Sequence, residues 1–158
     1  PTEGTPVILF SHGYNENRPG AYLHYSHLAE ALASAGWSVV SVQHELPTDE
    51  PLPLAGSAQV VRRPSWERGV INLLFVSDRL RVERPMLDLT RVTVMGHSQG
   101  GDISMLFAHL HPDLLFWLQR HYNELTVPGG VKHLAKIFIL DCNTFNVLYI
   151  TFHSSSSS

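Results

Sequence analysis

The stretch RVTVMGHSQGGDISMLFAHL, from Arg91 to Leu110, decides the fold of this chain. Its first five residues are mostly β-branched or apolar and predict a buried strand, whereas residues 103–110 predict a helix. Between them lies a G-x-S-x-G motif in which Gly96 and Gly100 flank Ser98. Glycines at these positions let strand and helix pack closely, and the sharp turn exposes the serine hydroxyl at the edge of a sheet. The motif predicts a nucleophile at Ser98, and an ordinary glycine-rich turn is the alternative.

Strand and helix patterns alternate along the rest of the chain. Apolar runs predict strands at 7–10, 37–42, 136–140 and 146–152, and helical spacing predicts helices at 20–35, 66–81 and 114–122. Residues 45–56 are rich in proline and acids and predict a surface loop. This alternation is typical of an α/β fold, with a mostly parallel sheet flanked by helices. We expect residues 1–153 to form a single domain and the serine run 154–158 to be a disordered or artificial tail.

The composition permits an enzyme and excludes some partners. The 158 residues are 44% hydrophobic with a net charge of -3, which allows a core and makes nucleic acid an unlikely partner. No apolar run reaches the length of about 18 residues that a membrane span needs. Cys142 is the only cysteine, so no internal disulfide is expected, and a secreted, periplasmic or cytoplasmic location stays open. Because the chain starts at Pro1, we expect an upstream segment, such as a signal peptide, to be missing.

Chemically useful groups follow the predicted strands. The carboxyl ends of parallel strands lie along one edge of the sheet, where α/β folds place their sites. We expect the strand before Ser11 to lie beside the strand before Gly96, which brings the loop that starts at His12 toward Ser98. The backbone N–H of Gln99 and an N–H of that loop would then converge, as the oxyanion of a tetrahedral intermediate requires.

These residues carry a resemblance. Together, Ser11-His12-Gly13-Tyr14, Gly96-His97-Ser98-Gln99-Gly100-Gly101 and the strand order resemble the α/β-hydrolase family, especially bacterial serine esterases and the cutinase, polyester-hydrolase and dienelactone-hydrolase branches. The resemblance extends from about Val7 to Asp141. It implies a carboxylesterase-type serine hydrolase for small-molecule esters, without cofactor or metal. Ser98 would be the nucleophile, and the N–H groups of Tyr14 and Gln99 would form the oxyanion hole. The Tyr14 ring could also shape the acyl pocket.

The same resemblance implies a catalytic acid and base near the end of the chain. The family order of Ser, then Asp or Glu, then His points to Asp141 and His153. Family members normally continue through two further strands and helices, so the fold is expected to be C-terminally shortened. Residues 142–145 are too few for a parallel crossover, so a strand at 146–152 would return antiparallel and leave His153 about 20 Å from the active edge. His153 reaches Ser98 only if this segment doubles back. Otherwise His153 is a tail residue, and Asp141 is a strand-end acid that binds a loop N–H.

Several of the ten histidines lie near the candidate site in sequence. We expect His12 to fix its loop through bonds to backbone groups and His97 to pack behind the turn. His44 follows a strand and is expected to border the cleft. The run from His109 to Asp113 has the H-x-H-x-D spacing of metal ligands. However, it ends the helix at the far edge from Ser98, where a contact with the helix dipole is the simpler interpretation.

Two other classes of function stay open. A shortened hydrolase fold could act as a non-catalytic binding or interaction module, and an open sheet edge would favour pairing with a second copy in a homodimer. A metal-dependent hydrolase that uses the excess of histidines is the other alternative. Labelling of Ser98 by a serine-directed phosphonate favours the serine hydrolase, and loss of activity with a chelator favours the metal enzyme.

Overall fold

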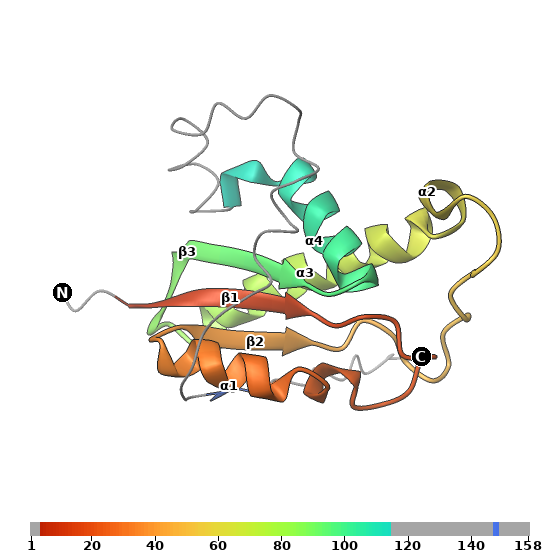
Figure 1. Cartoon of the computed structure of the whole chain (residues 1–158). Helices are drawn as coiled ribbons and strands as arrows, with labels where there is room; N and C mark the ends of the chain where they lie inside the picture. Colours follow the sequence, from red (N-terminus) through yellow and green to blue (C-terminus); the bar gives the residue numbers. More distant parts are fainter. Residues whose placement is uncertain (1–3, 115–146, 149–158) are drawn as a thin grey trace, which may run out of the picture.

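The computed structural model of the chain describes residues 4–114 and 147–148, which form an α/β fold around a parallel sheet (Figure 1). The three longer strands are β1 (Thr5–Ser11), β2 (Ser38–Val42) and β3 (Leu87–Gly96). Strand β1 lies in the centre and pairs in parallel with both others. A two-residue strand, β4 (Val147–Leu148), extends the sheet beyond β2. The predicted α/β class is confirmed, as is the predicted pairing of the strand before Ser11 with the strand before Gly96.

Helices cover both faces of this sheet (Figure 1). Helix α1 (Ser26–Ser34), preceded by the short 3-10 helix η1 (Ala21–Leu23), packs on one face. Helices α3 (Arg63–Glu83) and α4 (Gln99–Leu110) pack on the other face. The short helices α2 (Ala58–Val61) and η2 (Pro112–Leu114) precede α3 and follow α4.

Strand β1 contributes to the core on both of its faces. Val7 and Leu9 belong to the cluster under α3 and α4, whereas Ile8 and Phe10 belong to the cluster under α1. All four side chains are at most 3% exposed. A central parallel strand has helices on both sides, so both sets of alternating side chains are apolar. This explains why the run VILF has no polar residue.

The predicted helix at 20–35 is interrupted. Residues 21–23 form η1 and the regular helix begins only at Ser26, because Tyr25 leaves the helical conformation at φ -112° and ψ 28°. The Tyr25 ring lies 5.2 Å from the ring of Phe10. Packing of this aromatic side chain against the sheet therefore outweighs the helical periodicity of the segment.

Strand β3 begins earlier than its apolar run predicts. Leu87 and Asp88 pair with Thr5 and Pro6, and the register then shifts so that Val92 pairs with Val7. The Asp88 carboxylate holds the irregular residues, because it accepts hydrogen bonds from the Thr90 N–H at 3.0 Å and from the Arg91 guanidinium. The hydrogen bonds of Asp88 therefore let β3 include its first residues, although these residues do not alternate between apolar and polar.

The structure describes two residues of the strand predicted at 146–152, so its antiparallel return from 136–140 stays a prediction. Val147 and Leu148 pair in parallel with Val39 and Val40 of β2. A parallel pair needs only a long enough connection, and the chain between β2 and β4 far exceeds the dozen or so residues required. The predicted strand at 136–140 lies outside the described residues.

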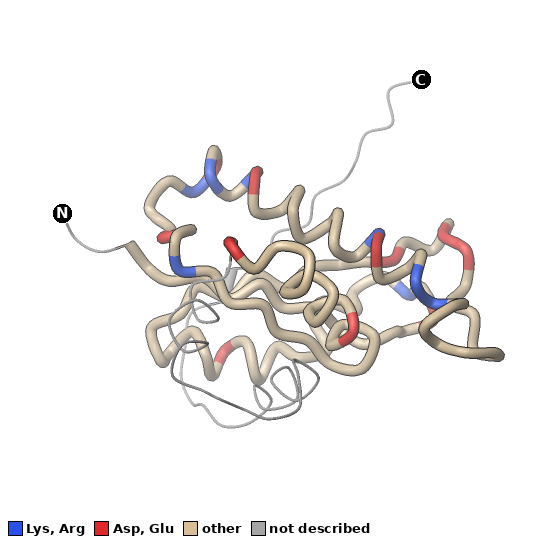
Figure 2. Tube along the Cα trace, turned by 90° about the horizontal axis from the view of Figure 1, so that it is seen from above, with Lys and Arg blue, Asp and Glu red and all other residues tan. Residues whose placement is uncertain are grey.

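Positively and negatively charged residues are interspersed along the described part of the chain (Figure 2). Two ion pairs on α3 join residues one helical turn apart. Arg63 pairs with Glu67 at 2.7 Å, and Arg79 pairs with Glu83. Each such solvent-exposed pair is expected to stabilise the helix by only about 0.3–0.5 kcal/mol. None of the described helices combines the length and the apolar character that crossing a bilayer demands.

Candidate active site

Ser98 occupies a strained turn between β3 and α4. Its backbone has a φ of 51° and a ψ of -120°, and it is one of three described non-glycine residues with a positive φ. The Gly100 N–H donates to the His97 carbonyl at 2.8 Å. These angles and this bond are those of a type II′ turn with serine at the first central position, which normally belongs to glycine. The side chain of Ser98 lies exposed at the carboxyl edge of the sheet.

Two glycines make this turn sterically feasible. A Cβ atom at Gly96 would lie 2.1 Å from the Gly100 carbonyl oxygen, and one at Gly100 would lie 2.1 Å from the carbonyl oxygen of Ser11. Real Cβ atoms do not approach oxygen so closely, so neither site accommodates a side chain without backbone movement. The G-x-S-x-G spacing therefore follows from how closely β3, α4 and the end of β1 approach each other.

The loop after β1 lies directly beside Ser98. The His97 N–H donates to the Ser11 carbonyl at 3.1 Å, and a Cβ placed on Gly13 would lie 3.4 Å from Ser98 Cβ. Tyr14 follows in this loop, and its hydroxyl accepts a hydrogen bond from the Leu52 N–H at 3.1 Å. The Tyr14 side chain is therefore tied to the loop after β2, which fixes the backbone beside the serine.

Gln99 is the first residue of α4, and its side chain is buried. The first N–H groups of a helix have no intrahelical acceptor, so the Gln99 N–H stands at the positive end of the α4 dipole. The side-chain Nε2 of Gln99 donates to Glu45 Oε1 at 2.6 Å. Gln99 is thus held by Glu45, which follows the carboxyl end of β2.

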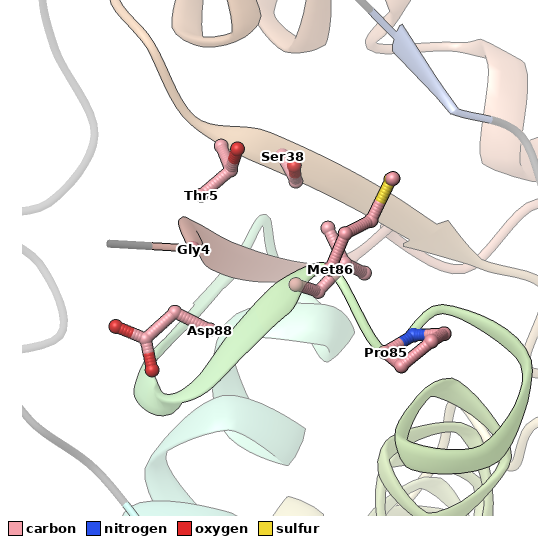
Figure 3. Close-up of a pocket in the computed structure, with 7 residues that line it drawn as sticks. Gly4, Thr5, Ser38, Pro85, Met86 and Asp88 are labelled. Carbon is pink, nitrogen blue, oxygen red and sulfur yellow. The ribbon is translucent and has the colours of Figure 1, made fainter. Parts of the chain in front are cut away.

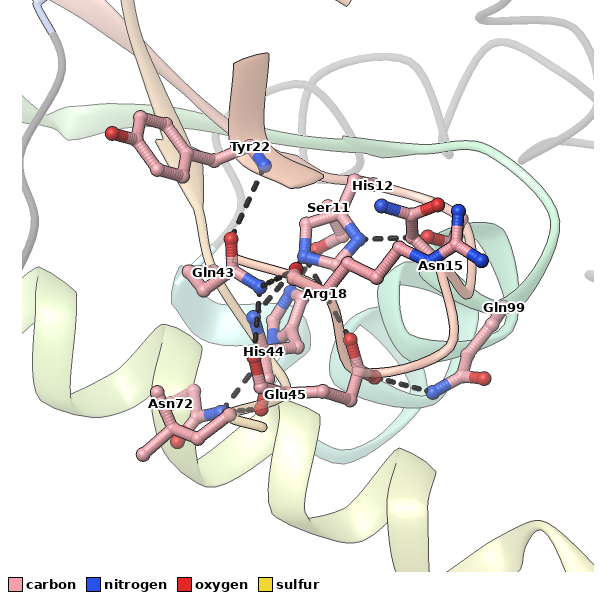
Figure 4. Close-up of polar contacts among 12 residues, drawn as sticks. Ser11, His12, Asn15, Arg18, Tyr22, Gln43, His44, Glu45, Asn72 and Gln99 are labelled. Atoms are coloured by element: carbon pink, nitrogen blue, oxygen red, sulfur yellow. Dashed lines mark hydrogen bonds and ion pairs between the residues drawn. The ribbon is translucent and has the colours of Figure 1, made fainter. Parts of the chain in front are cut away.

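A buried polar cluster lies beneath this edge of the sheet (Figure 4). His44 Nε2 lies 2.9 Å from Ser11 Oγ, and the Asn72 amide from α3 donates to the His44 carbonyl at 3.3 Å. His12 Nδ1 lies 2.7 Å from the Gly13 carbonyl oxygen, and the backbone N–H of His44 donates to His12 Nε2 at 3.2 Å. The prediction that His12 binds backbone groups is confirmed. The prediction that His44 borders a cleft is wrong, because His44 is only 5% exposed.

These contacts define the protonation of both imidazoles. His12 accepts at Nε2, so its proton sits on Nδ1 and points to the Gly13 carbonyl. Burial lowers the pKa of His12, although its bond to Gly13 acts in the opposite direction and nearby His24 adds to the lowering. Burial also lowers the pKa of His44 to about 3, with help from the charges of His12 and Arg68. Both rings are therefore neutral at pH 7. The His12 ring holds backbone groups, whereas the His44 ring contacts the Ser11 hydroxyl.

Acidification is expected to destabilise the fold through His44. In the unfolded chain this ring takes up a proton below its ordinary pKa of 6.5, whereas in the fold it does so only near pH 3. Its contribution is complete above pH 6.5 and is lost as the pH falls from 6.5 toward 3. The free energy of unfolding of wild type should fall by about 1.4 kcal/mol per pH unit more steeply than that of His44→Gln. Urea unfolding at pH 7.5, 6 and 5 measures the difference. Equal slopes in wild type and His44→Gln would contradict the prediction.

Glu45 is the residue of this region that the sequence did not reveal. The surface-loop prediction for 45–56 is wrong at its first residue, because Glu45 is only 4% exposed. Burial raises the pKa of Glu45 to about 7, against the opposing charge of Arg68 and in the same direction as the charge of Asp49. His12 Nε2 lies 3.7 Å from Glu45 Oε2, but that nitrogen already accepts the His44 N–H. The contact is therefore between neutral groups rather than a salt bridge.

His97 lies on the α1 side of the turn. Its Nδ1 lies within hydrogen-bond distance of the Tyr25 hydroxyl, at 2.6 Å, and burial raises the pKa of Tyr25. The expected packing behind the turn is only partly correct, because His97 contacts Tyr25 but remains exposed. Within residues 4–114, no histidine forms a hydrogen bond with Ser98 Oγ.

Asp141 and His153, the expected acid and base, both lie outside the described residues. The H-x-H-x-D run at the end of α4 lies within the described residues. The ring of His111 lies 5.3 Å from that of Phe107, and Asp113 is exposed. Among the described residues, no group of three or more His, Cys, Asp or Glu side chains could hold a metal ion.

A hollow of about 560 Å³ lies at the opposite edge of the sheet (Figure 3). Its lining comes from the amino ends of β1, β2 and β3 and from the turn before β3, and comprises Gly4, Thr5, Ser38, Pro85, Met86, Leu87 and Asp88. The strands run parallel, so this edge holds their amino ends, whereas Ser98 follows a carboxyl end. The hollow is therefore separate from the candidate active site.

The candidate active site thus combines a strained serine, an adjacent loop from β1 and a buried acid that holds the start of α4. Comparisons with protein-family models, with curated proteins and with solved structures find no match to this chain.

Proposed function

We propose that this chain is a serine hydrolase related to the α/β-hydrolase family that cleaves carboxylic esters through an acyl-enzyme on Ser98. The observation that carries the proposal is the backbone of Ser98, which holds a positive φ in a tight turn from a parallel strand into a helix. Such strain costs about 1–3 kcal/mol and persists mainly where function requires it. A hydroxyl displayed in this way is open to a substrate carbonyl from the solvent side.

The surroundings of Ser98 support an oxyanion hole formed by the N–H groups of Tyr14 and Gln99. The Tyr14 loop lies against the turn, as the 3.4 Å spacing between a Gly13 Cβ and Ser98 Cβ indicates. Gln99 begins α4, so the helix dipole adds positive potential where negative charge would develop. Preorganised N–H donors of this kind are worth about 10²–10³ in rate for each donor.

The proposed reaction proceeds in two steps. Ser98 Oγ attacks the ester carbonyl carbon while a histidine takes the hydroxyl proton, and the oxyanion binds the two N–H groups. The tetrahedral intermediate then releases the alcohol, which receives that proton, and leaves an acyl group on Ser98. Water, deprotonated by the same histidine, releases the carboxylic acid. By the family resemblance, His153 would be this base and Asp141 its acid partner.

A serine-directed fluorophosphonate tests the proposal. The native protein should gain one covalent adduct, and peptide mapping should place it on Ser98 rather than on exposed Ser57. The urea-unfolded protein should not react, because only the folded oxyanion hole activates the serine. Labelling that is insensitive to a chelator would also exclude the metal-dependent alternative. No adduct together with no hydrolysis of p-nitrophenyl butyrate would overturn the proposal and favour a binding module.

A further inference from the structure

Glu45 links the three strand ends that form the candidate active site (Figure 4). Its own backbone follows β2, where the Glu45 carbonyl accepts a hydrogen bond from Gln43 Nε2 at 2.7 Å. Its Oε1 accepts from the Gln99 amide at the start of α4 at 2.6 Å, and its Oε2 lies 3.7 Å from His12 Nε2 in the loop after β1. The contact with Gln99 is a hydrogen bond, and the contact with His12 is packing of the Glu45 carboxyl group against the imidazole ring.

We propose that Glu45 is a positioning residue that sets the spacing between the Tyr14 and Gln99 N–H groups by bridging the His12 loop to the first turn of α4. The role rests on the proposed function of Ser98. Oxyanion donors must be held within about 0.5 Å of their working position, and the residues that hold them must themselves be locked by packing. Glu45 and Gln99 meet this requirement, because they are only 4% and 3% exposed.

Ionisation of the Glu45 carboxyl group would make the oxyanion hole sensitive to pH. The ionisable groups that face Glu45 are His12 from the β1 loop, Asp49 from its own loop and Arg68 from α3. His12 is neutral and Asp49 opposes Arg68, so burial dominates and keeps a proton on Glu45 up to about pH 7. Protonated Glu45 still accepts the Gln99 bond through its carbonyl oxygen. Ionised Glu45 would add negative charge beside an oxyanion and so disfavour the transition state.

Two substitutions separate these effects. Glu45→Gln keeps an acceptor for Gln99 but cannot ionise, so its kcat should stay close to wild type at pH 6.5. Glu45→Ala removes the bridge, so kcat should fall about 10- to 100-fold with KM changed by less than about threefold. Exposed Glu50→Ala, in the same loop, is the matched control and should leave both constants unchanged.

The pH profile distinguishes a positioning role from a purely structural one. Between pH 6.5 and 8.5 the wild-type kcat should decrease by about tenfold, whereas that of Glu45→Gln should not. Rates are to be normalised to the folded fraction from urea unfolding, because loss of the bridge also destabilises the fold.

The outcomes are distinct. Two results would overturn the positioning role alone, provided that the wild type turns over the ester. One is a kcat of Glu45→Ala equal to that of wild type, and the other is a decrease of kcat with pH in Glu45→Gln that matches the wild type. Absence of both turnover and fluorophosphonate labelling in wild type would overturn the proposed function, and this role with it.

Discussion

A Gly100→Ala variant is expected to lose about 3 kcal/mol or more of its free energy of unfolding. The added Cβ would lie 2.1 Å from the carbonyl oxygen of Ser11 and 2.5 Å from that of His12. Both oxygens belong to the backbone at the end of β1, which cannot rotate away as a flexible side chain would. The first turn of α4 must therefore separate from the sheet. Urea unfolding, followed by circular dichroism, measures the loss.

Gly101→Ala is the matched control for this change. A Cβ at Gly101 would have its nearest neighbour, the Gly96 carbonyl oxygen, at 3.4 Å, which is close to ordinary contact. Alanine also favours the helix by about 0.5–1 kcal/mol relative to glycine. The control variant should match or exceed the wild type in stability. If Gly100→Ala were as stable as Gly101→Ala, the close approach of α4 to β1 would be wrong.

Replacement of Ser98 by alanine is expected to reduce the hydrolysis of p-nitrophenyl butyrate by at least about 10³-fold. Removal of the nucleophile abolishes the acyl-enzyme, and the oxyanion hole alone supports only slow attack by water. Exposed Ser57→Ala should retain the wild-type rate. The hydrolysis rate per folded protein is the measurement, and a Ser98→Ala variant with wild-type activity would place the nucleophile elsewhere.

A third variant at this position separates catalysis from stability. Ser98→Gly lacks the hydroxyl as Ser98→Ala does, but glycine tolerates a φ of 51° without steric cost. The free energy of unfolding of Ser98→Gly, measured with urea, should therefore exceed that of Ser98→Ala by about 1 kcal/mol. Both variants should be inactive. Equal stability of the two variants would show that the turn stores no strain.

The alternation of apolar runs and helical segments was enough to predict the fold class. The run Val7 to Phe10 is apolar at every position because a central strand is buried on two faces. The G-x-S-x-G spacing predicted the strand, turn and helix around Ser98 for a similar reason, since Gly96 and Gly100 face backbone atoms that exclude any side chain.

Other features depend on contacts that sequence spacing does not encode. Tyr25 breaks a helical pattern because its ring packs on Phe10 and its hydroxyl binds His97. Glu45 lies in a segment whose composition is that of a surface loop, and only the tertiary contact with Gln99 explains its burial. A glutamate directly after the strand-end histidine His44 was the one available signal, and it is too common to be decisive. The roles of Asp141 and His153 stay predictions.

The central position of β1 also determines which segments around the candidate active site are rigid and which are mobile. This strand is hydrogen-bonded along both edges and covered on both faces, so its amides can exchange with solvent only when the whole sheet opens. The loop from His12 to Tyr14 begins on this slowest-opening element. In contrast, residues 46–51 are mostly exposed and join the rest of the described chain by a few contacts, such as that of Asn17 with the Asp49 carbonyl at 2.7 Å. The outer segment is therefore expected to move on a timescale much shorter than unfolding, whereas the loop beside Ser98 stays fixed to the sheet.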